Sequence, residues 1–458
     1  MREFLLDLDV RDGKRVGLER GLRAAIREGR LPAGTLLPST RSLANDYEMA
    51  RATVVAAYEQ LTIEGYLVAH QGAGTRVANV AQVAELRSDD GNLWPKAPTT
   101  DFRPGEPDGA QFPRSSWGQA VRRVLAESTD GAFGYADPRG VAELRNVLAE
   151  YLGRSRAVVA TPNSVSVFGG VTASFGFLAE MFLRQGIERV AVEDPSLFLL
   201  RDVLTMVGLT IVPVRVDGDG IDVEHLSSLE VGAVVVTPAH QFPLGVTMSA
   251  PRRSELLQWA RNNDAWIVED DYDGEFRYDR RPIGSLQGLD PDRVIYAGTA
   301  SKMLSPALRL SWLVVPEALH ASLADVKHLR GGVSTIEQLA LASFIDRGDL
   351  DRHLRANRAH YQQRRSEVAA VLDRCSRWLA LSTAQAGLHL AATFIDPAID
   401  EQGLIEEASA VGLGLLGFGP LWLGSPRSQG LVIGFSRPAA HEFARSLDRL
   451  DDFLRSIR

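Results

Sequence analysis

The chain carries a lysine with an unusual set of neighbours, in the stretch VIYAGTASKMLSPALRLSWLVVP that runs from residue 294 to residue 316. Lys302 follows the apolar run VIYAG, Thr299 and Ser301 stand just before it, and Arg309 follows seven residues later. Two hydroxyl groups and a guanidinium can hold a phosphate dianion beside the lysine amine. A lone lysine after a strand is most often only exposed to solvent, so the prediction of a site depends on these neighbours.

A second contact to a phosphate is predicted in the segment VFGGVTAS. Gly169 and Gly170 would let backbone N–H groups, with those of Val171 and Thr172, approach an anion closely at the N-terminus of a helix. Together with the amine of Lys302, this cradle suits a phosphorylated aldehyde, because a lysine amine condenses with a carbonyl group.

Another polar group ends the apolar stretch WIVEDDYDGEF, which contains Asp270, Asp271 and Tyr272. In open α/β sheets, ligands bind outside the carboxyl ends of the strands, which is where these residues would stand. A carboxylate there could keep a pyridine nitrogen protonated, and a tyrosine hydroxyl could bond the phenolate oxygen of the same ring. The alternative is a helix cap or a solvated loop.

The elements that would position these groups follow from an alternation of apolar runs with helical stretches. The runs of strand length are RVAVEDP, TIVPVRV, AVVVTPA, WIVEDDY, VIYAGTA and LSWLVVP. Their alternation with helices predicts a mostly parallel sheet covered by helices, the α/β class. From about Arg352, a helical stripe and the short runs HLAATFI and GLVIGFS predict a smaller α+β subdomain.

The first eighty residues predict a separate domain. Apolar residues at helical spacing between Val16 and Glu28, then a short helix that Ser39 would cap and a helix from about Arg51 to Gly65, indicate a helix-turn-helix. The runs YLVA and TRVA around the turn HQGAG predict a β-hairpin, so the whole is a winged-helix pattern. The Pro-, Gly- and Asp-rich segment that follows predicts a linker.

Composition and charge narrow the partners. No segment is apolar enough to span a membrane, and the single cysteine, Cys375, together with the absence of a His/Cys cluster at ligand spacing, fits a cytoplasmic protein without a metal site. Residues 1–80 hold 11 Lys and Arg against 10 Asp and Glu, whereas the remainder holds 39 against 48. Attraction to a polyanion is therefore expected only near the N-terminus.

These patterns together resemble a known family. Residues 1–80 resemble the GntR winged-helix family through LPSTRSLA, MARATVVAAYEQLTIEGYL and GAGT, and residues 100–458 resemble fold type I aminotransferases that depend on pyridoxal 5′-phosphate (PLP). The fusion resembles the MocR/GabR regulators, through DFRPGEPD, FGYADPRG, EDDYDGEF and TASK followed by arginine. We accordingly expect a DNA-binding domain in 1–80, a linker in 81–112, a PLP-binding large domain in 113–351 and a small subdomain in 352–458.

The resemblance implies roles for single residues. Lys302 would form the Schiff base with PLP, Asp270 rather than Asp271 would pair with the pyridinium, and Tyr272 would contact the phenolate oxygen. The phosphate would be held by Thr299, Ser301 and Arg309 together with the cradle at Gly170, Val171 and Thr172. In the DNA-binding domain, the resemblance implies contacts to operator DNA from Arg41, Arg51, Thr53, Gln71 and Gly72.

Several positions depart from a working aminotransferase. Phe242 stands where the resembled enzymes have an asparagine, so that a hydrogen bond to the cofactor is lost or moves to Gln241. Val432 stands where the resembled enzymes have an arginine that clamps a substrate carboxylate, and an aliphatic side chain cannot form that bidentate pair. Leu199 stands where a GABA-type regulator would have a second carboxylate-binding arginine. In the winged helix, Ala50 replaces the usual capping Ser or Thr of the recognition helix.

We therefore interpret the chain as a homodimeric transcriptional regulator that senses a small amine or amino acid by aldimine exchange at Lys302. The alternatives are a PLP-dependent aminotransferase with an appended domain, against which Val432 argues, and a regulator that senses PLP itself. The general look of the chain is closest to regulators of ectoine or taurine use. An ectoine-derived diaminobutyrate is the first effector that we would test.

Overall fold

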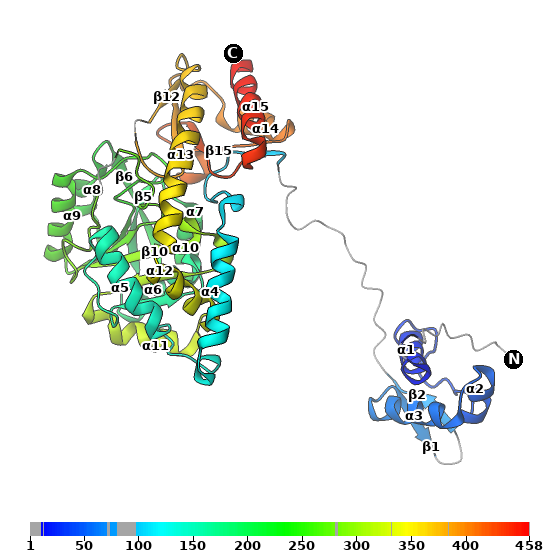
Figure 1. Ribbon diagram of the computed structural model, residues 1–458. Helices are drawn as coiled ribbons and strands as arrows, with labels where there is room; N and C mark the ends of the chain where they lie inside the picture. The colour runs from blue at the N-terminus through cyan, green and yellow to red at the C-terminus, as the bar shows by residue number, and fades with distance from the viewer. Residues whose placement is uncertain are drawn as a thin grey trace. The chain divides into compact units, whose positions relative to one another are not determined.

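The computed structural model describes residues 11, 13–70, 74–79, 98–279, 283–330, 332–382 and 384–457. The chain divides into two compact units, Met1–Lys96 and Ala97–Arg458, which are described separately (Figure 1). None of the helices in the described ranges is both long enough and apolar enough to cross a membrane.

The first unit is a winged helix, as predicted. Its elements are α1 (Lys14–Arg27), α2 (Thr40–Asp46), α3 (Arg51–Ile63) and a hairpin of antiparallel strands β1 (Leu67–His70) and β2 (Gly74–Val77). The hydroxyl of Ser39 caps α2 by accepting from the backbone N–H of Ser42 at 3.1 Å, whereas Ala50 gives α3 no side-chain cap. Residues from every element fill one apolar core, among them Leu18, Leu43, Val54 and Leu67.

The expected linker at 81–112 is wrong at its C-terminal end. Residues 81–97 lie outside the described residues, but residues 98–112 belong to the second unit. Strand β3 (Thr100–Asp101) pairs in parallel with β14 (Leu413–Gly414), and Phe102 is fully buried. The polar, Pro-rich composition concealed this because a two-residue strand has no periodicity to detect.

The second unit is built on an eight-stranded sheet in the order β4, β11, β10, β9, β8, β5, β6, β7. The predicted mostly parallel sheet is confirmed: β10, β9, β8, β5 and β6 are parallel neighbours, and the outer strands are antiparallel. The strands are β4 (Val165–Phe168), β5 (Arg189–Asp194), β6 (Thr210–Asp217), β7 (Gly220–Ile221), β8 (Ala233–Val236), β9 (Trp266–Asp270), β10 (Val294–Thr299) and β11 (Ser311–Val314).

Helices cover both faces of the sheet because successive side chains of its strands alternate between the faces. On β5, Val190 and Val192 pack in the cluster under α6 (Val171–Arg184), α7 (Phe198–Val207) and α11 (His320–Arg330), while Ala191 packs toward the opposite face. That opposite face is covered by α8 (Val223–Ser227) and α9 (Ala250–Asn262), and by α4 (Arg114–Glu127), α5 (Ala142–Arg156) and α12 (Thr335–Asp346).

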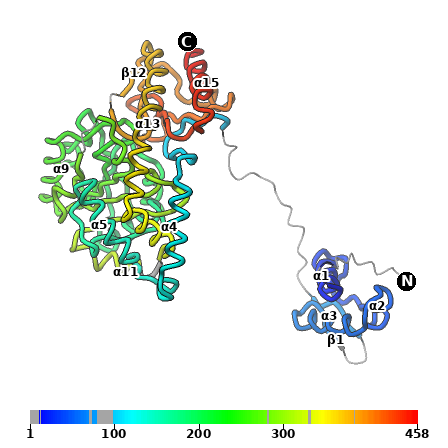
Figure 2. The backbone as a smooth tube through the Cα atoms, in the orientation of Figure 1, coloured from blue at the N-terminus to red at the C-terminus, as the bar shows by residue number. Residues whose placement is uncertain are grey.

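The C-terminal part is the expected α+β subdomain, gathered at one end of the second unit (Figure 2). Its antiparallel sheet has the order β12 (Leu379–Leu381), β13 (His389–Phe394), β16 (Gly430–Gly434), β15 (Leu416–Gly417), with α14 (Glu401–Ala410) and α15 (Phe443–Ser456). The long helix α13 (Asp349–Asp373) contains the expected boundary at 351/352 and joins both parts through its buried residues (Figure 1).

Candidate functional site

Lys302 lies at the carboxyl end of β10, in the short helix α10 (Ala300–Met303). Its Nζ donates a hydrogen bond to the carbonyl oxygen of Gly105, a residue 197 positions earlier in the chain. Burial lowers the pKa of Lys302, although the carboxylates of Asp273 and Asp270 act in the opposite direction. A lowered pKa leaves more of the amine neutral, which is the form that attacks a carbonyl group.

The groups predicted to hold a phosphate converge beside this lysine. The hydroxyl of Thr299 caps α10 by accepting from the N–H of Ser301 at 3.1 Å, and it donates to the hydroxyl of Ser301 at 3.0 Å. Arg309 adopts a left-handed backbone conformation with φ of 50°, which is uncommon for a residue other than glycine. Its guanidinium lies over Gly170, where a Cβ would come within 3.0 Å of the guanidinium carbon.

Gly170 also caps the N-terminus of α6, so Val171 and Thr172 begin that helix with backbone N–H groups that have no partner inside it. Two helix N-termini and one guanidinium thus face the same part of the cavity. This donor set fits a phosphate dianion, because each component favours negative charge.

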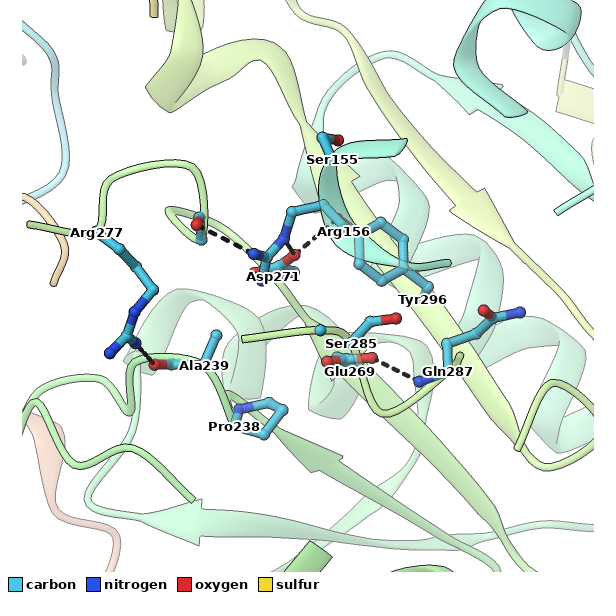
Figure 3. Close-up of polar contacts among 12 residues, drawn as sticks. Ser155, Arg156, Pro238, Ala239, Glu269, Asp271, Arg277, Ser285, Gln287 and Tyr296 are labelled. Atoms are coloured by element: carbon cyan, nitrogen blue, oxygen red, sulfur yellow. Dashed lines mark hydrogen bonds and ion pairs between the residues drawn. The ribbon is translucent and has the colours of Figure 1, made fainter. Parts of the chain in front are cut away.

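Asp270 and its neighbour Asp271 have opposite environments. Asp271 forms a buried ion pair with Arg156 at 2.6 Å and accepts from the hydroxyl of Tyr296 at 2.8 Å (Figure 3). Asp270, at the end of β9, has a buried Oδ1 with no hydrogen-bond partner among the described residues. Burial raises the pKa of Asp270 to about 7, and the charge of Asp271 adds to this effect.

An orphaned buried carboxyl oxygen normally has a functional explanation. A protonated ring nitrogen from a bound cofactor would satisfy Asp270, whereas Asp271 is fully occupied by Arg156 and Tyr296. The residues present therefore fit PLP, and the structure supplies the physical reason for preferring Asp270 that the sequence lacked.

Tyr272 belongs to a network that the sequence did not predict. Its hydroxyl donates to the backbone oxygen of His240 at 3.0 Å and lies 3.2 Å from the ring Nδ1 of the same histidine. Asp273 contacts that nitrogen at 3.0 Å, and the ring of His389 lies beside the His240 ring, with 4.7 Å between the ring centroids. Burial lowers the pKa of His389 to about 3, so its imidazole is neutral. This network fixes the orientation of Tyr272.

A cavity of about 550 Å³ joins these groups. This is the size expected of a small-molecule site. The predicted residues that line it are Val171, Thr172, Asp270, Tyr272, Thr299, Ser301, Lys302 and Arg309. Much of the remaining wall is apolar, from Leu197, Phe198, Leu199, Phe242 and Leu416.

At the positions that depart from the aminotransferase pattern, the side chains pack among apolar residues or form hydrogen bonds to the backbone. Val432 is fully buried in a small apolar cluster with Ala391 and Phe418, and Phe242 packs against that cluster and also lines the cavity. The side-chain amide of Gln241 donates to the carbonyl oxygens of Pro195 and Phe242 at 2.9 and 2.7 Å. It is therefore committed to the backbone, which favours loss of the hydrogen bond to the cofactor rather than its transfer.

Two arginines of the cavity wall and the two carboxylates that pair with them were not predicted from the sequence. Arg103 and Arg437 line the cavity; both pair with the carboxylate of Asp101, and Arg437 also pairs with Glu106. We refer to Asp101, Arg103, Glu106 and Arg437 as the arginine cluster. Arg437 stands directly after the predicted run GLVIGFS, and DFRPGEPD holds the other three, so both signals were present but far apart in sequence.

Of the predicted DNA-contact residues, Arg41 and Arg51 are exposed and Thr53 is partly exposed. Arg41 lies in α2 and Arg51 is the first residue of α3, two positions before Thr53. In the described part of this unit, neither arginine forms an ion pair, which leaves both guanidinium groups free to meet phosphate or base edges. The wing residues Gln71 and Gly72 lie outside the described residues.

Comparisons with known proteins agree with this architecture. Residues 98–408 match the family model for aminotransferase class I and II, and residues 15–77 match the model for bacterial regulatory proteins of the gntR family. The fold resembles an archaeal alanine:glyoxylate aminotransferase, with a TM-score of 0.71 and 23% identity over 78% of this chain and 91% of that one. A Pyrococcus horikoshii kynurenine aminotransferase gives a TM-score of 0.71 and 22% identity, over 79% of this chain and 92% of that one.

Relatives that match most of the chain include transcriptional regulators. A probable rhizopine catabolism regulatory protein, MocR, of Rhizobium meliloti is 34% identical over 94% of this chain and 92% of its own. The pyridoxine biosynthesis regulator PdxR of Corynebacterium glutamicum is 30% identical over 91% of each chain. The regulator TauR of Rhodobacter capsulatus is 30% identical over 79% of this chain and 81% of its own. The chain therefore belongs to the MocR-type transcriptional regulators, in which a GntR winged helix that binds operator DNA is joined to an aminotransferase class I and II domain that binds PLP.

Proposed function

We propose that this regulator responds to an amino compound whose amine takes the place of Lys302 on the cofactor. The observation that carries the proposal is the cavity in which Lys302, the unpartnered Asp270 and the phosphate cradle meet, while position 432 holds a buried valine. The cavity has the parts needed to bind an amine covalently. It lacks, at position 432, the guanidinium that would fix an amino acid for turnover.

Each residue has a definite task in this proposal. When bound, PLP supplies an aldehyde that condenses with amines and a ring that withdraws electrons. Asp270 would hold a proton on the ring nitrogen, and Tyr272, oriented by His240, would contact the phenolic oxygen. Arg309, with Thr299 and Ser301 and the N–H groups of Val171 and Thr172, would hold the phosphate.

Displacement of Lys302 would free its amine from the cofactor, and the free amine can make a further contact. As a free amine, the Nζ of Lys302 donates to the carbonyl oxygen of Gly105, which lies in the segment that follows β3 near the start of the second unit. An effector that binds only one arrangement of this segment would shift the population toward that arrangement. This is the route by which we infer that amine binding alters DNA binding.

We further propose that the protein acts in the cytoplasm as a homodimer, which would match repeated operator half-sites. The full exposure of Tyr135 and the 55% exposure of Phe133 support the dimer, because such aromatic surface is normally covered by a partner. Both residues lie in the stretch FGYADPRG.

A second candidate is a regulator that senses PLP itself. The 30% identity to the pyridoxine biosynthesis regulator PdxR favours it. The two candidates differ in what changes operator affinity: an amine added to the PLP-loaded protein, or PLP added to the PLP-free protein.

The test is a screen of amines, starting with diaminobutyrate, against the full-length PLP-loaded protein. Visible absorption reports exchange at Lys302, and the affinity for DNA upstream of the gene reports signalling. An amine that changes both supports the proposal. Operator affinity that responds to PLP and to none of the amines would establish the second candidate instead.

A further inference from the structure

Arg437 is one of the arginines that line the cavity containing Lys302. It follows β16 by three residues, and carboxylates occupy its nitrogens. Nη1 pairs with Asp101, while Nη2 and Nε pair with the two oxygens of Glu106, the latter at 3.3 Å. Glu106 thus meets Arg437 with both oxygens, which is the geometry by which arginine recognises a carboxylate.

The two carboxylates on Arg437 are not equivalent. Asp101 is part of β3, its side chain is 16% exposed, and it also accepts from Arg103 at 2.8 and 2.9 Å. The side chain of Glu106 is 52% exposed, and Arg437 is its ion-pair partner in the described part of the chain. A half-exposed pair of this kind contributes little net stability, so Glu106 can turn into solvent at small cost.

The pair lies next to the contact that Lys302 makes. Gly105, whose carbonyl accepts from the lysine Nζ, directly precedes Glu106, and the backbone oxygen of Glu106 accepts from the hydroxyl of Ser436 at 2.6 Å. A Cβ on Gly105 would be 3.8 Å from the lysine Nζ. Gly105, Lys302 and Arg437 line the same cavity, so an amine bound in place of Lys302 shares that cavity with the Arg437 guanidinium.

The net charge of the arginine cluster indicates that the Glu106 carboxylate occupies a place that an anionic group of a ligand could take. The arginine cluster contains two guanidiniums and two carboxylates and is neutral; if Glu106 turns away, one positive charge remains unbalanced at the cavity. Arg201, a buried arginine of the wall, is not available, since it donates to the carbonyl oxygens of Leu421 and Pro420 at 2.7 and 2.9 Å.

We propose that Arg437 binds the acidic group of the effector and that Glu106 occupies this place when the effector is absent. The effector class is then an amine that carries a carboxylate or sulfonate at its other end. This inference depends on the proposed amine exchange at Lys302 and identifies the chemistry of the compound that exchanges. It also moves the expected anion contact from position 432, which is buried among apolar side chains, to position 437.

The experiment compares matched amines on the full-length PLP-loaded protein. The probes are taurine and the ω-amino carboxylates from β-alanine to 5-aminopentanoate, each against the n-alkylamine of equal carbon number. Apparent affinities come from the change in visible absorption. We expect the acidic member of the best-fitting pair to bind about 10-fold tighter or more, as a charge-assisted bidentate contact implies.

Two variants and a control test whether Arg437 causes the preference for acidic amines. Arg437→Gln should abolish the preference and leave alkylamine affinity within about twofold, since alkylamines make no charge-assisted contact there. Glu106→Gln, which keeps Arg437 intact, should raise the affinity for acidic probes several-fold without changing that for alkylamines. Arg427→Ala, an exposed arginine of the same subdomain, is the control and should change neither.

The outcomes separate this inference from the proposed function. Equal affinity for acidic probes and alkylamines, or a preference that survives Arg437→Gln, overturns the inference while amine exchange stands. If no probe changes the absorption of the PLP-loaded protein, amine exchange fails and the inference fails with it. A preference that Arg437→Gln removes and Glu106→Gln strengthens supports it, whether the acid is a carboxylate or a sulfonate.

Discussion

The cofactor end of the cavity takes its polar groups from short local motifs, whereas the arginine cluster takes them from segments more than three hundred positions apart. Thr299, Ser301, Lys302 and Arg309 span eleven consecutive residues, and Asp270 ends the strand next to them in the sheet. Arg437 and Glu106, in contrast, are separated by 331 positions. The ends of neighbouring strands position the residues of the cofactor end. The arginine cluster depends instead on how the C-terminal subdomain packs against the segment after β3.

This difference suggests that the cofactor end binds PLP in one fixed way and that the arginine cluster exchanges its contacts for a ligand. Residues at the ends of adjacent parallel strands have little freedom, which suits a cofactor that is always held in the same way. The arginine cluster joins a half-exposed side chain to the C-terminal subdomain, and contacts of this kind can be exchanged for a ligand at small cost. Variants at the two ends should therefore fail in different ways.

The largest expected effect is at Lys302. Lys302→Ala should remove the covalent cofactor completely without unfolding the chain, because the amine bonds only the carbonyl of Gly105 and supports no apolar core. Borohydride reduction followed by mass measurement detects the adduct, and circular dichroism checks the fold. A reducible PLP adduct that persists in Lys302→Ala would show that the cofactor lysine is elsewhere.

The next effect separates the two neighbouring aspartates. Asp271→Asn leaves Arg156 buried without its counter-charge, so the free energy of unfolding should fall by about 3–5 kcal/mol. Asp270→Asn should change it by less than about 1 kcal/mol, because Oδ1 of this carboxyl has no partner among the described residues and the pKa of the group is raised to about 7.

Denaturant unfolding of both PLP-free variants measures this contrast. Titration with PLP then tests the cofactor role, since Asp270→Asn should weaken PLP binding while leaving the fold intact. If Asp270→Asn destabilises the chain as strongly as Asp271→Asn, the unpartnered oxygen of Asp270 is a structural group, and its assignment to the ring nitrogen is wrong.

The sequence predicted the cofactor end more completely than the arginine cluster. Lys302 and Asp270 stand at the ends of apolar runs, where a parallel sheet must deliver them together. The network around Tyr272 was missed because His240 and His389 meet from loops and strands 149 positions apart in the chain, and no local pattern records that contact. The strands β4, β7, β12, β14 and β15, of two to four residues, were also too short to show a period.

The third prediction concerns turnover. With Val432 buried, nothing at that position holds an α-carboxylate, so a bound amino acid can rotate about its Cα–N bond. Conversion of PLP to pyridoxamine phosphate by common L-amino acids should be at least about 100-fold slower than the roughly 1–1,000 per second typical of enzymes. Single-turnover absorption measures it. Rapid and complete conversion would favour the aminotransferase alternative.

The smallest expected effect extends the comparison to the winged helix. Arg51, like Lys302, was predicted from a local sequence motif. Arg51 opens α3 and is exposed, with a weak contact to the hydroxyl of Thr40 at 3.5 Å, so little holds it except the start of the helix. If it reads a base, Arg51→Ala should weaken operator binding by about 1–3 kcal/mol and relax the preference for one sequence. If it meets only phosphate, the loss should be equal on all sequences, and the slope of affinity against salt should fall by about one ion.

Arg41→Ala, in α2, provides the matched comparison on the same unit. Titration of operator and scrambled DNA at several salt concentrations distinguishes the cases. Unchanged affinity in both variants would mean that DNA is read by another surface, and that a local motif located the cofactor but not the DNA contact.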